Sequence, residues 1–91
     1  MRVELSTNEG RCGDRVQIRV QPETAEPVTG VHVTVDAYGL DVPLHREGEQ
    51  WVGEESVPYE AEPGVYYLQV RAYDSGWRTI ESAQTTFTVR A

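Results

Sequence analysis

The chain has 91 residues, a formal net charge of −7, 38% hydrophobic residues and 25% charged residues. A chain of this length forms one domain with one modest core, so we expect residues 1–91 to be a single domain. We interpret this domain as excised from a larger protein. The negative charge disfavours nucleic acids and anionic membranes as partners, because both present phosphates. No apolar run reaches the roughly 18 residues of a membrane helix, and membrane insertion is therefore not expected.

Apolar and polar residues alternate along most of the chain, which is the pattern of half-buried β-strands. The strands predicted in chain order cover residues 2–5, 15–21, 31–37, 40–45, 51–58, 66–73 and 79–90. Glycine, proline, asparagine and aspartate separate them as turn formers. About seven short strands with turns roughly every 8–12 residues are typical of a sandwich or barrel. No window has the apolar spacing of a helix.

The strand predicted at residues 66–73 alternates along its whole length, and the predicted fold is built around it. One face carries Tyr66, Leu68, Val70 and Ala72, and the other carries Tyr67, Gln69, Arg71 and Tyr73. The first set is predicted to face the core. Other side chains predicted to face inward are Val3, Leu5, Val16, Ile18, Val20, Val31, Val33, Val35, Ala37, Trp51, Val57, Phe87 and Val89.

Three residues in these strands carry local predictions. Pro43 lacks an amide donor, so its strand should lie at a sheet edge. Gly53 either weakens its strand or marks a bulge. Tyr66 follows a Pro-Gly corner at an inward position, where a buried hydroxyl needs a partner. It is either a tyrosine corner, bonded to backbone a few residues upstream, or an ordinary core tyrosine.

The C-terminal half contains a recognisable set of residues. They are Trp51-Val52-Gly53, Val57-Pro58, Pro63-Gly64-Val65-Tyr66, and then Leu68, Val70, Ala72, Asp74 and Gly76. This pattern resembles the immunoglobulin-like modules of bacterial and archaeal surface and secreted proteins. The resemblance implies an immunoglobulin-like β-sandwich of about seven antiparallel strands in two sheets and an extracellular or cell-surface location. Leu68 occupies the position of the second cysteine of antibody domains, so the antibody branch is not suggested.

The residue types of catalytic and metal sites are present but not grouped. His32 and His45 are not spaced as metal ligands and are interpreted as exposed strand residues. No motif for hydrolysis, redox chemistry or phosphate binding occurs, and the single thiol of Cys12 has no second cysteine to pair with. Glu23, Glu26 and Asp74 should share one end of a sandwich, where we interpret them as solvated loop acids rather than a calcium site. We therefore expect no enzyme, no cofactor and no metal.

Three aromatic residues near the end of the chain are the candidate binding residues. Tyr67 and Tyr73 should face outward, and Trp77 lies in the following turn. They could stack on sugar rings or anchor a protein partner, pack against an adjacent domain, or cover a neighbouring strand.

Two hypotheses about function follow from these observations. The first is a non-catalytic structural or interaction module, which spaces or contacts proteins or neighbouring domains. The second is a small carbohydrate-binding or enzyme-accessory domain that uses these aromatic residues. Three coplanar exposed rings would favour the second, and rings folded onto neighbours would favour the first.

Overall fold

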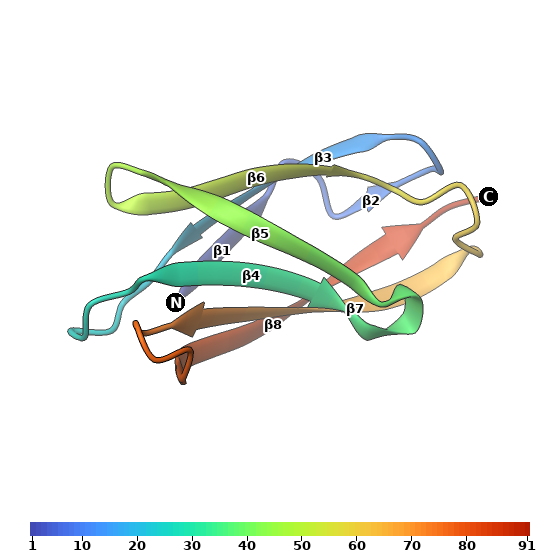
Figure 1. Cartoon of the computed structure of the whole chain (residues 1–91). Helices are drawn as coiled ribbons and strands as arrows, with labels where there is room; N and C mark the ends of the chain where they lie inside the picture. Colours follow the sequence, from blue (N-terminus) through green and yellow to red (C-terminus); the bar gives the residue numbers. More distant parts are fainter.

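The computed structural model describes all 91 residues and is an all-β structure with one short helical turn (Figure 1). The strands are β1 (Arg2–Leu5), β2 (Glu9–Gly10), β3 (Arg15–Gln21), β4 (Gly30–Val35), β5 (Leu40–Glu47), β6 (Gln50–Ser56), β7 (Gly64–Tyr73) and β8 (Thr79–Val89). The 3₁₀ turn η1 (Asp36–Tyr38) links β4 to β5. The chain contains no helix with the length and apolar character needed to cross a bilayer.

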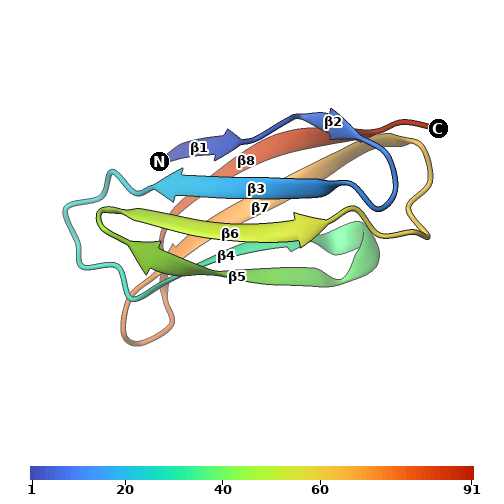
Figure 2. The same ribbon diagram turned by 90° about the horizontal axis from the view of Figure 1, so that it is seen from above.

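The strands form one curled sheet in the order β1-β3-β6-β5-β4-β7-β8-β2. Figures 1 and 2 show β3 and β6 on one side and β4, β7 and β8 on the other, with β5 crossing from one side to the other. All neighbours run antiparallel except β2 and β8, which are parallel. Because the sheet curls, side chains from both sides share one interior.

The predicted all-β class is confirmed, but the number and direction of the strands need correction. The structure has eight strands in a mixed sheet rather than about seven antiparallel ones. The additional strand is β2, whose two residues pair with Thr88 and Val89. Two residues are too few to show an alternation, and the sequence pattern there indicated only a turn.

The predicted edge position of Pro43 is confirmed for Leu40–Leu44, which pair only with β4, but it does not hold for β5 as a whole. β5 pairs with β4 through Leu40–Leu44 and then with β6 through His45–Glu47, so it lies in the middle of the strand order. Pro43 falls in the first half, where β4 is the only partner. A missing amide donor is tolerated on a side that has no neighbouring strand.

The inward and outward faces follow the predicted alternation in most strands. On β7, Leu68 is 8% exposed and Val70 and Ala72 are fully buried, while Gln69 and Arg71 are only half-buried. The other buried residues are Val16, Ile18, Val20, Val31, Val33, Val42, Leu44, Trp51, Val57, Ala61, Phe87 and Val89. Ala37 is the exception: it was predicted to face inward but is exposed, because the chain has already turned into η1.

Gly53 lies in a regular stretch of β6, directly opposite Ile18, and not in a bulge. A Cβ atom built on this glycine would lie 2.5 Å from Cδ2 of Leu44. That distance is shorter than carbon atoms tolerate, so any larger residue would displace the leucine. The glycine is therefore explained by the close approach of β5 where it crosses between the two sides.

Tyr66 has the upstream hydrogen bond predicted for a tyrosine corner. Its hydroxyl donates to the backbone carbonyl of Glu62 at 2.5 Å and lies 2.9 Å from the hydroxyl of Tyr38. The backbone N–H of Glu62 donates in turn to the Tyr38 oxygen at 3.1 Å. The three groups close a ring of hydrogen bonds. The hydrogen bond with Tyr38, followed by burial, raises the pKa of Tyr66 to about 12.

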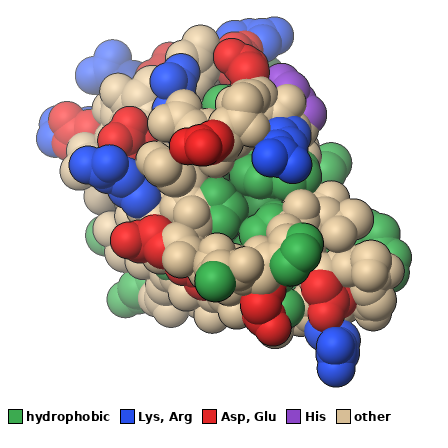
Figure 3. Space-filling view, turned by 90° about the vertical axis from the view of Figure 1, so that its left-hand side faces the viewer, with side chains coloured by type: hydrophobic (Ala, Val, Ile, Leu, Met, Phe, Trp, Pro, Cys, Tyr) green, Lys and Arg blue, Asp and Glu red, His purple; other side chains and the backbone are tan.

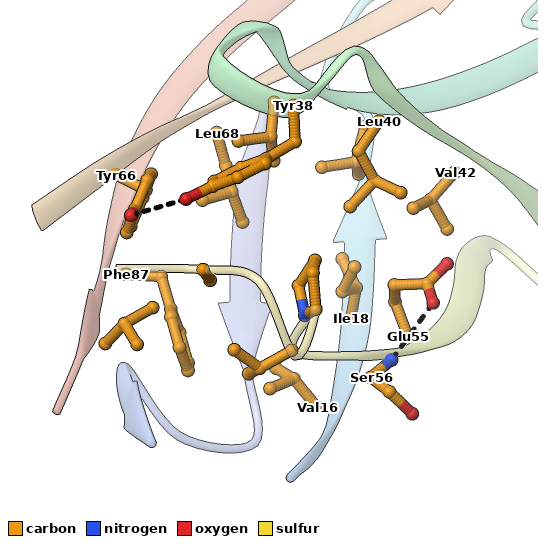
Figure 4. Close-up of a pocket in the computed structure, with 16 residues that line it drawn as sticks. Val16, Ile18, Tyr38, Leu40, Val42, Glu55, Ser56, Tyr66, Leu68 and Phe87 are labelled. Atoms are coloured by element: carbon orange, nitrogen blue, oxygen red, sulfur yellow. Dashed lines mark hydrogen bonds between the residues drawn. The ribbon is translucent and has the colours of Figure 1, made fainter. Parts of the chain in front are cut away.

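This ring borders an apolar cavity of about 80 Å³ (Figure 4). The lining comes from both sides of the sheet and includes Ile18, Leu40, Val42, Leu68 and Phe87. The cavity lies where β5 and β6 separate beyond their short paired segment. Because the lining is almost entirely aliphatic and aromatic, we interpret the cavity as a packing gap in the core rather than a polar ligand site.

Candidate functional site

The turn between β7 and β8 shapes the most unusual surface of the molecule. The N–H of Asp74 donates to the carbonyl of Arg78, and the N–H of Trp77 donates to the carbonyl of Asp74, both at 3.0 Å. The Asp74 carboxylate oxygen Oδ1 accepts the N–H groups of Gly76 and Arg78, both at 2.9 Å. These bonds lower the pKa of Asp74, with the Arg78 N–H as the largest favourable contribution. The Asp74 carboxylate therefore stabilises the conformation of this turn.

Trp77 occupies the left-handed position of this turn, with φ of +61°. It is the only residue other than glycine with positive φ in the chain. Glycine is usual at such a position, and a bulky side chain there costs about 1–2 kcal/mol. The indole is nevertheless 68% exposed. Strained residues of this kind often lie at functional sites, so Trp77 is the starting point for a candidate site.

The indole belongs to a small cluster that we call the aromatic patch, formed by His32, Tyr73 and Trp77. The ring centroids of Tyr73 and Trp77 are 5.9 Å apart with planes tilted by 57°. His32 meets Tyr73 and Trp77 edge-on, with centroids 5.6 and 6.1 Å apart. A Cβ atom placed on Gly30 would lie 3.8 Å from Cζ3 of Trp77, so the indole also covers the start of β4.

An acidic residue holds the imidazole of the patch in place. Nδ1 of His32 lies 2.8 Å from Oδ1 of Asp41, on the neighbouring strand β5. The Asp41 side chain is 58% exposed and that of His32 is 25% exposed. His32 faces outward as predicted, but it is not a freely solvated histidine, because Asp41, Tyr73 and Trp77 enclose it.

The three predicted binding residues do not form one surface. Tyr73 and Trp77 are in contact in the aromatic patch, whereas Tyr67 lies six residues earlier on the same face of β7, roughly 20 Å away in a strand. Tyr67 is 59% exposed and neighbours Val65, which is 58% exposed. The structure therefore separates Tyr67 from the other two rings.

The sequence pattern did not indicate that His32 belongs to the patch or that Asp41 is its hydrogen-bond partner. The hairpin of β4 and β5 places His32 opposite Pro43 and Thr34 opposite Asp41, which makes His32 and Asp41 diagonal neighbours on one face. This register would have followed from treating the turn at Tyr38-Gly39 as the closure of a hairpin. Gly39, with φ of +60°, ends η1 there.

The patch lies at the end of the molecule that also carries the β3–β4 loop and the β5–β6 turn. This end is shown face-on in Figure 3, where hydrophobic atoms are visible between charged side chains. A shallow hollow at the end is lined by Pro22, Glu26, Pro27, Val28, Arg46, Glu49 and Trp51. The loops thus share one end as predicted. The Asp74 carboxylate, however, already accepts hydrogen bonds from the backbone of its own turn. No three acidic, histidine or cysteine side chains gather in a group that could hold a metal ion.

Exposed aromatic surface at the opposite end has a structural explanation. Tyr59 is 84% exposed, and its ring covers Gly13, where a built Cβ atom would lie 3.0 Å from the tyrosine hydroxyl. The nearby thiol of Cys12 is half-buried and donates to the carbonyl of Ala61 at 3.3 Å. These contacts hold the β2–β3 turn against the β6–β7 connection.

Comparison with known proteins does not assign the chain to a family. No family model matches the sequence, and no curated protein matches it at a significant level. The function must therefore be argued from the fold and the surface.

Proposed function

We propose that this chain is an immunoglobulin-like β-sandwich module that acts as a non-catalytic contact or spacer domain of a larger surface or secreted protein. The fold part of the proposal is supported by the curl of the sheet into two facing sides. It is supported further by the hydrogen bond from Tyr66 to Glu62, because a corner of this kind is a hallmark of such domains.

The functional part rests on one observation, the exposed indole of Trp77 held at positive φ beside Tyr73 and His32. About two thirds of the Trp77 side chain stays exposed in the isolated fold and is available for a contact. Tryptophan and tyrosine supply large contact area with few rotatable bonds, which is why they are enriched at protein contacts. We infer that the aromatic patch contacts a neighbouring domain or a protein partner.

The alternative is a carbohydrate-binding or accessory domain. Exposure of Trp77 beside Tyr73 favours it, since aromatic rings stack on the apolar faces of sugars. Two features favour protein contact instead. The planes of Tyr73 and Trp77 are tilted by 57°, and Tyr67 is too far away to extend a flat platform.

Oxidative footprinting of the two tryptophans tests the contact proposal. Trp77 is exposed and Trp51 is 9% exposed in the same chain, so Trp51 serves as an internal control. We expect Trp77 to be oxidised rapidly in the isolated domain and protected in the full-length protein that contains it. Equal oxidation of Trp77 in both proteins would contradict a contact between this patch and the rest of the molecule.

Fluorescence titration with soluble polysaccharides tests the alternative. The Trp77→Ala variant keeps the buried Trp51 and is the matched control. A saturable change in the wild type that is absent from the variant would replace the contact proposal by carbohydrate binding. No change across the panel is the result that the contact proposal expects.

A further inference from the structure

Strand β8 has a long edge without a partner. Its residues from Thr79 to Val89 pair with β7 on one side. On the other side, β2 covers only Thr88 and Val89. The backbone from Thr79 to Phe87 therefore has no neighbouring strand on its outer side.

The hydrogen bonds at the end of β8 establish which backbone groups face this open side. The N–H of Thr88 donates to the carbonyl of Asn8 at 2.9 Å, away from β7. Successive residues of a strand direct their N–H and C=O groups to alternate sides. The N–H and C=O groups of Ser82, Gln84 and Thr86 therefore face the open edge in one row.

The part of this edge from Ser82 to Phe87 lacks the features that usually prevent strands from pairing, because the bulge of β8 lies before it, between Thr79 and Glu81. Edge strands are normally short or carry proline, a bulge or charges. The edge strand β1 has only four residues, and the open part of β5 contains Pro43. The segment from Ser82 to Thr88 contains neither proline nor a charged residue.

The side chains of the segment also indicate an open flank. Leu68 and Val70 on β7 are buried, but the residues opposite them, Thr85 and Ala83, are only half-buried although they face inward. The charge nearest to the segment, Glu81, is already engaged: its carboxylate accepts the N–H groups of Glu23 and Thr24 and forms an ion pair with the N-terminal ammonium of Met1. An added strand would cover Ala83 and Thr85 without displacing this contact.

We propose that β8 pairs antiparallel with β8 of a second copy of the chain, centred on Gln84. The two-fold axis places Gln84 opposite Gln84 and Ser82 opposite Thr86 of the second copy. Six backbone hydrogen bonds can then form, three donors from each copy. The side-chain pairs are neutral and polar, and pairs of this kind stabilise neighbouring strands. A second copy fits because the segment is self-complementary and carries no like charges to oppose each other.

The charge of the chain adds a dependence on salt. Each copy carries a net charge of −7, so the rest of the two molecules repel one another. Salt screens exposed charges over about 8 Å at physiological ionic strength. The dissociation constant of the dimer should therefore fall as sodium chloride is raised from about 0.05 to about 0.5 M.

Sedimentation equilibrium of the 10.2 kDa chain over micromolar to millimolar concentrations tests the proposal. The informative variant is Gln84→Pro, which removes an N–H that the monomer does not use. Two hydrogen bonds are lost in the dimer, one from each copy, and its dissociation constant should rise about 30-fold. The control Gln84→Ala keeps the N–H and should change the constant by less than about threefold.

Two results would overturn the proposal. One is a wild-type chain that stays monomeric up to millimolar concentration in 0.5 M salt. The other is equal association of wild type and Gln84→Pro, which would place any dimer contact elsewhere. Circular dichroism melting establishes that the proline variant is folded. If it is not, hydrogen exchange of the Gln84 amide in the wild type decides the question, since the dimer requires slower exchange at high concentration.

Discussion

The left-handed conformation of Trp77 leads to a prediction in which two substitutions should rank in an unusual order. We compare Trp77→Gly with Trp77→Ala. Both variants lose the indole and its contacts with Tyr73 and His32, so those losses cancel in the comparison. What remains is the effect of a single Cβ atom at φ of +61°.

The magnitude follows from two opposing contributions. Alanine in the left-handed region costs about 1–2 kcal/mol relative to a right-handed conformation, whereas glycine has no such cost. Glycine in turn loses about 0.5–1 kcal/mol more than alanine through the freedom of its unfolded backbone. The glycine variant should therefore be the more stable by about 0.5–1 kcal/mol. At a position with ordinary φ the order is reversed.

Urea unfolding followed by the fluorescence of Trp51, the only tryptophan left in either variant, measures this difference. With a denaturant slope of about 1–3 kcal/mol per molar, the midpoint of the glycine variant should be higher by about 0.5 M. The free energy of unfolding of the wild type should exceed that of the alanine variant by about 2 kcal/mol at most, because roughly a third of the indole surface, about 80 Å², is covered. An alanine variant as stable as the glycine variant, or more stable, would refute the left-handed conformation.

Two further predictions concern the interior. Tyr66→Phe removes the hydroxyl that donates to Glu62 and should lower the urea midpoint, whereas Tyr67→Phe, on an exposed ring, should not. Folding raises the pKa of Tyr66 from 10.0 to about 12. The protonated hydroxyl therefore contributes fully to the stability of the fold below pH 10, and this contribution is lost as the pH rises through 12. An absorbance titration of tyrosinate should show a step near pH 12 that Tyr66→Phe abolishes, and its persistence would be evidence against the assignment. Gly53→Ala should destabilise by about 1–3 kcal/mol through overpacking against Leu44, and Leu44→Ala in the same chain should reduce this penalty, as a double-mutant cycle would measure.

Local patterns were sufficient for much of the fold. The alternation from Tyr66 to Ala72 predicted which side chains of β7 face the core, and the same rule predicted the buried faces of β3 and β4. A strand changes face with every residue, so a run of six to eight residues carries that information without knowledge of its neighbours. The Pro-Gly corner before Tyr66 likewise indicated a hydroxyl in need of an upstream partner.

Features that depend on pairing between distant segments required the tertiary structure. The passage of β5 from β4 to β6 explains why residue 53 is glycine, because it brings Leu44 against that position. The turn after β7 places Trp77 at positive φ and in contact with His32. Tyr67 lies away from both of these residues. The unpaired edge of β8 is visible only once the extent of β2 is known. Strand register and partner choice arise from interactions across the sheet, and alternation within one strand is the same whichever strand lies beside it.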